Sequence, residues 1–499
     1  MIVHVDGNIN KYYVQTLCMV FFPGATFGAG EVPRPDLPEV TVSTYVDKEG
    51  TETAYASIKL NDKETEAVVS VSKDEPVSIA TRSAIAAGRA LFAAGKEMLG
   101  YVPPWGILTG VRPAKVAAGI LHTTGGIIKT KRVLRDEFFL SPQKAALALS
   151  VAQNEIKLTK KIPKNSCSLY ISIPFCPSRC SYCSFVSYTT PRLLSMIDEY
   201  IDALISDLDD TFETIRTLGL DIITVYIGGG TPTTLSTKQL KRILSKVYEN
   251  TDREKLTEFT LEAGRPDTIT KEKLAVAKKY GVTRVSVNPQ TLDDNVLKEI
   301  GRKHTAEDFY RAFEIAKESG IKDINVDLIA GLPGVDFKKF ADTLDKVIEL
   351  EPSNITVHTF CVKKASDMLK NNTGVYSLSG GDAAKSVSYS QLRAKFSGYK
   401  PYYMYRQKNT VGNLENVGFS KEGCEGMYNI YMMEEMQTIF AVGAGSVTKL
   451  VNYDRNDESG TRIERIFRQK YPYEYLRAHK ENSDYKTALR EKILKFFEK

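Results

Sequence analysis

The pattern of apolar and polar residues divides the chain into three regions, and the first covers residues 1–160. It begins with alternating runs such as EVTVSTYV and TAYASIKL and continues into alanine-rich stretches such as SAIAAGRALFAAGKEML. Alternation with period two is typical of half-buried strands, whereas apolar residues three or four positions apart are typical of helices. The pattern therefore predicts an N-terminal α+β domain.

The second region, residues 165–365, alternates short β-rich runs with amphipathic helical segments. Its six strand-like runs are SLYISI, IITVYI, EFTLEA, TRVSVN, INVDLIA and NITVHTF. Strands separated by helices build parallel sheets through right-handed crossovers. Six such repeats predict the α/β class and a partial (β/α)6 barrel similar to a TIM barrel.

The third region, residues 380–499, has less regular spacing. A tyrosine-rich stretch, YKPYYMYRQKN, precedes glycine-punctuated sequence and then charged sequence with helical spacing. We expect a third, mostly helical domain here.

Composition narrows the class of protein. The chain has 499 residues, 42% of them apolar and 26% charged, which suits a large soluble protein with two or three domains. Its longest apolar runs are far shorter than the roughly 20 residues that span a bilayer, and its first residues do not resemble a signal peptide. We therefore expect no membrane span and a cytoplasmic location.

The charge and the cysteine content of the chain limit the kinds of ligand and compartment that we expect. The 67 basic and 61 acidic residues give a net charge of +6 without any block of lysine and arginine, so a nucleic-acid partner is not expected. An anionic small molecule suits the same charge. The seven cysteines, an odd number, argue against a disulfide framework and for a reducing compartment in which thiolates can bind a metal.

Polar residues follow or end each of the six predicted strands. Active sites of β/α barrels lie at this carboxyl end of the sheet. The residues concerned are Cys176, Cys180 and Cys183 after the first strand, GGGTPT (228–233) after the second, and then Glu262, Gln290, Asp327, His358 and Cys361. We expect these residues, which come from six separate strands, to meet at one mouth.

The first three cysteines form the pattern C-x3-C-x2-C. Zinc usually takes four ligands in two C-x2-4-C pairs, and Cys167, Cys361 and Cys424 stand alone. Three thiols on one short loop suit a [4Fe–4S] cluster better, because they bind three irons and leave the fourth with an open position. Zinc and a chance grouping remain the alternatives.

This cysteine pattern at the end of a first barrel strand resembles the radical S-adenosylmethionine (SAM) superfamily. The resemblance implies that the amino and carboxylate groups of SAM bind the fourth iron. A narrower resemblance, to the oxygen-independent coproporphyrinogen III oxidase family and its relative, the heme chaperone, rests on LYISIPFCPSRCSYCSF, YIGGGTPTTL, RVSVNPQTLDDNVLKEIGRKHT and INVDLIAGLPG. The flanking segments WGILTGVRPAKVA and YYMYRQKNTVGNLENVGF resemble the HemZ-type branch, the coproporphyrinogen dehydrogenases.

The resemblance implies a set of SAM contacts at the strand ends. They are Tyr170, Tyr182, Gly229, Gly230, Thr231, Glu262, Gln290, Arg302, Asp327 and Cys361. Their chemistry is suitable, because glycine lets the backbone approach a ligand, carboxylates accept hydrogen bonds from ribose or ammonium, and arginine pairs with a carboxylate. Taken singly, each has a plain structural alternative, namely a turn, a salt bridge at the rim of the barrel, or a packed aromatic ring.

Two positions depart from the oxidase pattern. That family has a further cysteine two residues after the third ligand and a histidine in the preceding strand, where this chain has Phe185 and Ser172. Phe185 agrees with the heme chaperone pattern instead. Both departures leave the cluster ligands intact and put the decarboxylation in question.

The resemblance also implies a reaction. A reduced cluster cleaves SAM, and the resulting 5′-deoxyadenosyl radical takes hydrogen from a propionate, which loses carbon dioxide and one electron to become a vinyl group. Two such conversions turn coproporphyrinogen III into protoporphyrinogen IX in porphyrin and heme biosynthesis, with electrons from a cytosolic one-electron donor. We take Arg406 and Lys408 as candidate ligands of the propionates, with a solvated loop as the alternative.

Three functions from different classes follow from these residues. The first is the SAM-dependent tetrapyrrole decarboxylase. The second is a heme-binding delivery protein that keeps the cluster and makes no vinyl product, which Phe185 supports. The third is a radical SAM enzyme for another anionic substrate.

Overall fold

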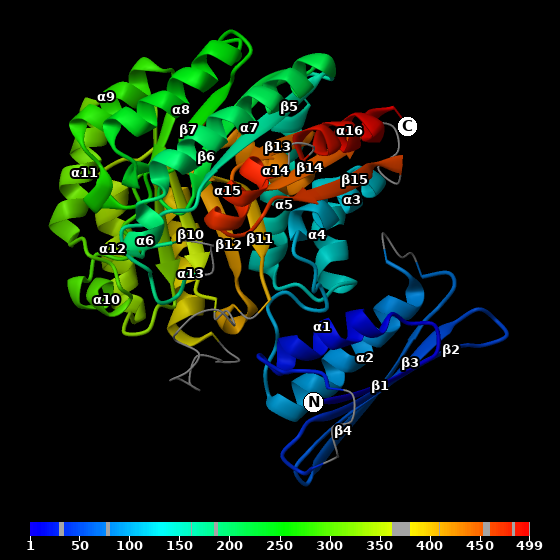
Figure 1. Ribbon diagram of the computed structural model, residues 1–499. Coiled ribbons are helices and arrows are strands. Elements are labelled where there is room, and N and C mark those ends of the chain that lie inside the picture. The colour runs from blue at the N-terminus through cyan, green and yellow to red at the C-terminus, as the bar shows by residue number, and fades with distance from the viewer. Residues whose placement is uncertain are drawn as a thin grey trace.

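The structure is a computed structural model of the chain, and its strands form two separate sheets (Figure 1). It describes residues 1–28, 34–75, 80–160, 162–183, 188–361, 380–408, 410–452, 460–481 and 485–498. Within these ranges one sheet has four strands and the other has eleven. The α/β prediction is confirmed, and the large sheet carries the polar strand ends.

The small sheet and two helices form the N-terminal part. The elements are β1 (Ile2–Asp6), α1 (Lys11–Phe21), β2 (Glu39–Val46), β3 (Glu52–Leu60), β4 (Lys63–Val71) and α2 (Arg82–Leu99). The strands lie in the order β1-β2-β3-β4, with β1 parallel to β2 and the others antiparallel. The predicted alternation is visible in β2, where Val40 and Val42 are fully buried. Helix α2 covers one face of this sheet by packing on β3 and β4.

Three further helices of the first 160 residues pack on the large sheet. They are α3 (Pro113–Thr124), α4 (Ile127–Asp136) and α5 (Pro142–Thr159). Helices α3 and α5 contact strand β11 (Lys400–Arg406), and Figure 1 shows all three apart from the small sheet. A buried contact fixes this arrangement, because Trp105 Nε1 donates to Glu415 at 2.8 Å and Lys144 also bonds that carboxylate. The packing therefore groups α3–α5 with the core rather than with the small sheet.

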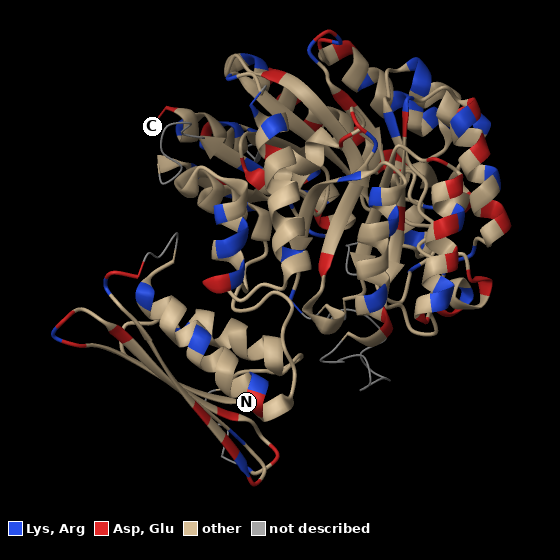
Figure 2. Ribbon diagram, turned by 180° about the vertical axis from the view of Figure 1, so that it is seen from behind, with Lys and Arg blue, Asp and Glu red and all other residues tan. Residues whose placement is uncertain are grey.

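The centre of the large sheet consists of the six parallel strands that the sequence predicts. They are β5 (Ser166–Ile173), β6 (Asp221–Gly229), β7 (Glu258–Leu261), β8 (Arg284–Ser286), β9 (Asp323–Ala330) and β10 (Asn354–Thr359). The helices between them are α6 (Pro191–Leu194), α7 (Ile197–Thr217), α8 (Thr237–Asn250), α9 (Lys271–Lys279), α10 (Asp294–Glu299), α11 (Ala306–Glu318) and α12 (Phe337–Glu349), with short turns η1 (Pro232–Thr234) and η2 (Pro266–Thr268). Figure 2 shows that many of the charged residues of the chain lie on the helices around the large sheet.

The region after residue 380 differs from the prediction of a mostly helical domain. Its elements are α13 (Gly381–Phe396), β11 (Lys400–Arg406), η5 (Val411–Asn413), β12 (Glu415–Ser420), α14 (Met427–Glu434), β13 (Thr438–Val442), β14 (Val447–Asn452), β15 (Arg462–Phe467), α15 (Pro472–Glu481) and α16 (Tyr485–Phe497). The helices are present, but the five strands continue the core sheet on both sides, in the order β11-β12-β10-β9-β8-β7-β6-β5-β13-β14-β15. These strands satisfy the backbone groups of β5 and β10, which in a closed barrel pair with each other.

No helix in the described ranges is both long and apolar enough to cross a membrane.

Candidate functional site

A cavity of about 820 Å³ opens at the carboxyl ends of β5–β10 and extends toward β14 and β15. Every residue predicted to bind the cluster or SAM lines it. These are Cys176, Cys180, Cys183, Tyr170, Tyr182, Gly229, Gly230, Thr231, Glu262, Gln290, Arg302, Asp327 and Cys361. The carboxyl ends of parallel strands meet at one edge of a sheet, so residues far apart in sequence converge here.

The cysteine loop is held by backbone hydrogen bonds to its neighbours. Cys176 N–H donates to Tyr188 O at 3.1 Å, and Ser181 N–H donates to Ile300 O at 3.0 Å. Within the loop, Cys183 N–H donates to Cys180 O at 3.1 Å and closes a turn. The spacing of the thiols is therefore set by backbone contacts as well as by sequence.

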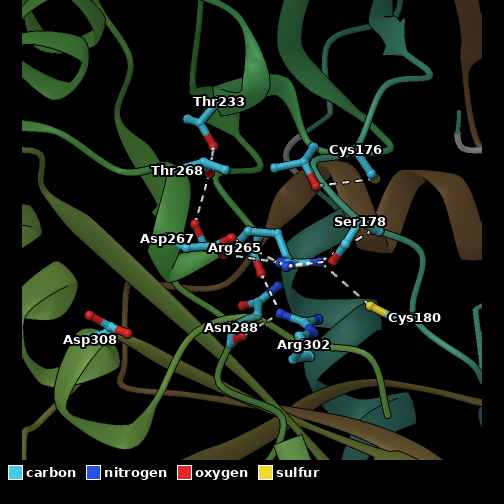
Figure 3. Close-up of polar contacts among 12 residues, drawn as sticks. Cys176, Ser178, Cys180, Thr233, Arg265, Asp267, Thr268, Asn288, Arg302 and Asp308 are labelled. Atoms are coloured by element: carbon cyan, nitrogen blue, oxygen red, sulfur yellow. Dashed lines mark hydrogen bonds and ion pairs between the residues drawn. The ribbon is translucent and has the colours of Figure 1, made fainter. Parts of the chain in front are cut away.

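Arg265 holds the middle of this loop (Figure 3). Its Nη1 lies 3.7 Å from Cys180 Sγ as a donor, and its Nη2 donates to Ser178 Oγ at 3.0 Å. Its Nε donates to Asp267 Oδ1 at 3.1 Å, which fixes the plane of the guanidinium. Arg265 was not among the predicted site residues, although it follows the third predicted strand by a few residues.

The glycine segment after β6 lies directly against the cysteine loop. A Cβ on Gly230 lies 2.6 Å from Phe175 O and 3.0 Å from Cys176 Sγ, so a side chain there collides with the loop. Gly229 has φ +108°, a conformation that other residues rarely adopt. Thr231 N–H donates to Phe175 O at 2.8 Å, and its Oγ1 lies 3.3 Å from Cys176 Sγ. The segment is therefore a close-packed support for the first cysteine rather than a free turn.

The donor set fits a cluster better than a single metal ion. In the described residues no three His, Cys, Asp or Glu side chains converge as one ion requires. Thiolates that bind a [4Fe–4S] cluster each hold a different iron, so they need to surround a volume and not a point. Cys176, Cys180 and Cys183 line one end of the cavity in this manner, and the cramped space at Gly230 keeps that end clear of other side chains.

Arg302 is buried at the same rim. It donates to the carbonyl oxygens of Gly264 and Asn288 at 3.1 and 3.0 Å, and to the Tyr182 hydroxyl at 3.0 Å. Burial alone lowers the pKa of Arg302, but Tyr182 and Cys180 raise it overall, so the side chain stays charged. Its Nε has no hydrogen-bond partner among the described residues. This buried donor is available to an anionic group of a ligand.

Glu262 and Asp327 are two half-buried carboxyl groups with different charge states. Burial and the nearby Asp327 raise the pKa of Glu262 to about 8. Burial also acts on Asp327, but hydrogen bonds from His358 and Asn325 hold its pKa below the usual value. Asn288 Nδ2 donates to Asp327 Oδ2 at 2.8 Å, and His358 Nε2 lies 3.6 Å from the same oxygen. At neutral pH the cavity thus offers one protonated carboxyl and one carboxylate.

Two groups of tyrosines form an aromatic wall beyond these carboxyl groups. Tyr428 stacks on Tyr226 with ring centroids 4.7 Å apart, and Tyr226 stacks on Tyr170 at 6.1 Å. Tyr403 and Tyr405 stack at 6.3 Å on strand β11. The tyrosine-rich stretch was visible in the sequence, but its role as cavity wall was not assigned. Such a wall offers flat apolar surface to a planar or cyclic ligand.

The structure does not bring Arg406 and Lys408 to the cavity, which corrects their prediction as propionate ligands. Residues alternate across a strand, so Arg406 points away from the face of β11 that carries Tyr403 and Tyr405. Its guanidinium is buried, bonds Leu108 O and lies 5.3 Å from the centre of the Trp105 ring. Lys408 is exposed and donates to the Tyr12 hydroxyl at 2.7 Å. Both residues connect the core to the N-terminal part.

Two remaining candidates concern the oxidase pattern. Ser172 is buried and donates to Ala444 O at 2.8 Å, and it does not line the cavity. Phe185 lies outside the described residues. Cys361 does line the cavity, and its Sγ donates to Lys408 O at 3.3 Å.

Comparison with known proteins gives consistent results. The model of the radical SAM superfamily matches residues 170–347. The oxygen-independent coproporphyrinogen-III oxidase-like protein HemZ of Bacillus subtilis is 36% identical over 359 residues, which are 71% of this chain and 72% of HemZ. The heme chaperone HemW of the same organism is 32% identical over 283 residues, 56% of this chain and 70% of HemW. Among solved structures, coproporphyrinogen III oxidase (HemN) of Escherichia coli matches with a TM-score of 0.47 and 20% identity, over 66% of this chain and 72% of HemN.

Proposed function

The chain belongs to the radical SAM superfamily, in the group that includes HemZ and HemW, and we propose that it is a cytoplasmic oxidoreductase that converts coproporphyrinogen III to protoporphyrinogen IX. Its cofactors are those of the superfamily, a [4Fe–4S] cluster and SAM. The observation that carries the proposal is the single cavity in which three thiols, two unlike carboxyl groups and an aromatic wall face one another.

The cluster is held by Cys176, Cys180 and Cys183, and SAM lies beside it at the strand ends. Arg265 stabilises the Cys180 thiolate through its N–H group. Arg302, whose buried Nε lacks a partner among the described residues, would bind the carboxylate of SAM, and Asp327 would accept from its ammonium or ribose hydroxyls.

The cofactors supply the hydrogen-abstracting radical when bound, and the protein positions the propionate and excludes water. Each conversion removes one hydrogen atom, one molecule of carbon dioxide and one electron, and leaves a vinyl group. The stacked rings of Tyr170, Tyr226 and Tyr428, the last of them buried, form the apolar surface against which the tetrapyrrole lies. A one-electron donor from the cytosol would reduce the cluster before each cleavage of SAM, and a separate acceptor would take the electron that each decarboxylation releases.

The test is anaerobic turnover with reconstituted protein. Reduced protein with SAM and coproporphyrinogen III is expected to give 5′-deoxyadenosine and a product with two vinyl groups, both detected by mass spectrometry. Cleavage of SAM that never transfers hydrogen from the tetrapyrrole, traced with deuterated propionates, contradicts the proposed reaction.

The second candidate is heme delivery, favoured by the match to the heme chaperone HemW at 32% identity. On that function, the protein binds heme at the aromatic wall and forms no vinyl product. Heme titration of the cluster-loaded protein, run beside the turnover assay, distinguishes the two functions.

A further inference from the structure

The far end of the cavity carries three cations around one carboxylate, Glu435, which directly follows α14. Arg465 Nη2 and Lys449 Nζ lie 2.8 and 3.4 Å from Glu435 Oε1, and Arg112 Nη1 lies 2.9 Å from Oε2. Lys449 and Arg465 line the cavity. Burial raises the pKa of Glu435, but these three cations hold it below the usual value.

The pairing of β14 with β15 places the cations beside apolar side chains. Lys449 lies opposite Arg465, and Val447 lies opposite Phe467, with all four residues facing the cavity. Like charges directly opposite each other destabilise a sheet unless an anion lies between them. Glu435 is that anion in the absence of a ligand.

The positive charge of this end exceeds the negative charge of the groups that face it. Glu434 and Glu155 are the other nearby acidic residues. Burial and Glu434 raise the pKa of Glu155 to about 10, so Glu155 is uncharged at neutral pH. Among the described residues three cations therefore face two carboxylates at most, and Arg465 exposes 48% of its side chain to an entering ligand.

Apolar side chains continue this end of the cavity into solvent. Met432 and Met433 line it from α14, and Phe467 exposes 71% of its surface. An apolar surface bordered by cations matches a ligand with an apolar ring system and carboxylates at its edge. We propose that Lys449 and Arg465 bind a propionate carboxylate of the tetrapyrrole, in exchange for Glu435. This inference rests on the proposed function and assigns the substrate end of the same cavity.

The exchange follows from the geometry of the guanidinium. Arg465 presents a planar fork of N–H donors that fits a carboxylate in two-point contact. Glu435 holds both Arg465 and Lys449 through the same oxygen, so a substrate carboxylate that binds the two cations displaces that oxygen. Glu435 then competes with the substrate for the same cations, and its removal strengthens binding.

The test measures the dissociation constant of coproporphyrin III and of its tetramethyl ester by absorbance, with the full-length protein. Arg465→Gln and Lys449→Gln are each expected to weaken coproporphyrin binding about tenfold and to leave the ester unchanged. Glu435→Gln is expected to tighten the binding of coproporphyrin III several-fold. Lys492→Gln is the matched control, because Lys492 pairs with Glu464 outside the cavity lining.

The signs of these changes separate binding from a structural role. If Arg465→Gln, Lys449→Gln and Glu435→Gln all weaken the binding of both porphyrins alike, these charged residues have a structural role and the inference is wrong. Equal dissociation constants in the parent, Arg465→Gln and Lys449→Gln overturn the carboxylate site and leave the proposed function standing. Failure of the parent to bind either porphyrin overturns both.

Discussion

The two ends of the cavity are built on opposite principles. At the strand ends of β5–β10 the polar groups are half-buried and bound to fixed neighbours, as Arg302 is to two carbonyl oxygens and Asp327 is to Asn288. At β14 and β15 the cations share one carboxylate and Arg465 is half exposed. A site whose polar groups are held by fixed neighbours suits a resident cofactor, whereas an exposed surplus of charge suits a ligand that enters and leaves.

The largest expected effect at the rigid end is the loss of the cluster in Cys180→Ser. A hydroxyl is a far weaker ligand for iron than a thiolate, so we expect iron and sulfide content and visible cluster absorption to fall to background. Cys424→Ser is the control, because Cys424 lies outside the cavity lining. A Cys180→Ser protein that keeps a complete cluster contradicts the assigned ligands.

Arg265→Gln tests whether the rigid end depends on its buried cation. The substitution leaves Asp267 without its partner and removes the donor to Cys180, so we expect unfolding to be easier by about 3 kcal/mol and the cluster to be lost faster to a chelator. Urea unfolding and chelation kinetics measure the two effects. Arg253→Gln, at an exposed position, should change neither.

Whether the sequence predicts the position of a site residue depends on which structural feature places that residue. The residues from Tyr170 to Cys361 were identified correctly as cavity lining because parallel strands bring their carboxyl ends to one edge. Arg406 was misplaced because the side of a strand that a residue faces depends on register, which β11 acquires only by pairing with β12. Tyr405 lines the cavity, whereas the next residue, Arg406, points to the opposite face of the strand and into the protein interior.

The end of the cavity at β14 and β15 was not predicted, for a different reason. Strands β14 and β15 are short and mix charges with apolar residues, so VTKLVN and RIERIF do not distinguish strand from helix. The pairing of Lys449 with Arg465 exists only once the two strands align, and Glu435 joins them from another element. A site made of three elements with no common motif cannot be identified from spacing alone.

Glu262→Gln should alter the pH dependence of stability at the rigid end. The pKa of Glu262 is raised to about 8 by burial and Asp327, so the folded protein keeps a proton that the unfolded chain releases near pH 4.3, roughly the ordinary value. This contribution to the free energy of unfolding is complete below that value and is lost as the pH rises toward about 8.

In Glu262→Gln the part of the fall in the free energy of unfolding that is due to Glu262 should disappear. Urea unfolding at pH values near the two limits, about 4.3 and about 8, measures this. Glu254→Gln, which alters an exposed carboxylate, should retain the decline of the parent. The same decline in Glu262→Gln as in the parent contradicts a protonated Glu262.

The smallest effect is expected for Lys408→Gln, which compares an exposed cation outside the cavity with Arg465 inside it. Both are exposed cations near tyrosines or apolar residues, but the Lys408 ammonium lies 4.3 Å from the centre of the Tyr12 ring and outside the cavity lining. An exposed contact of this kind contributes about 0.5–1 kcal/mol to the packing of the N-terminal part and nothing to a ligand in the cavity. We therefore expect the coproporphyrin dissociation constant of Lys408→Gln to equal that of the parent, while Arg465→Gln weakens binding. If Lys408→Gln weakens binding as much as Arg465→Gln, the affinity reflects the overall positive charge of the protein, and the two ends of the cavity do not differ in the way that their geometry indicates.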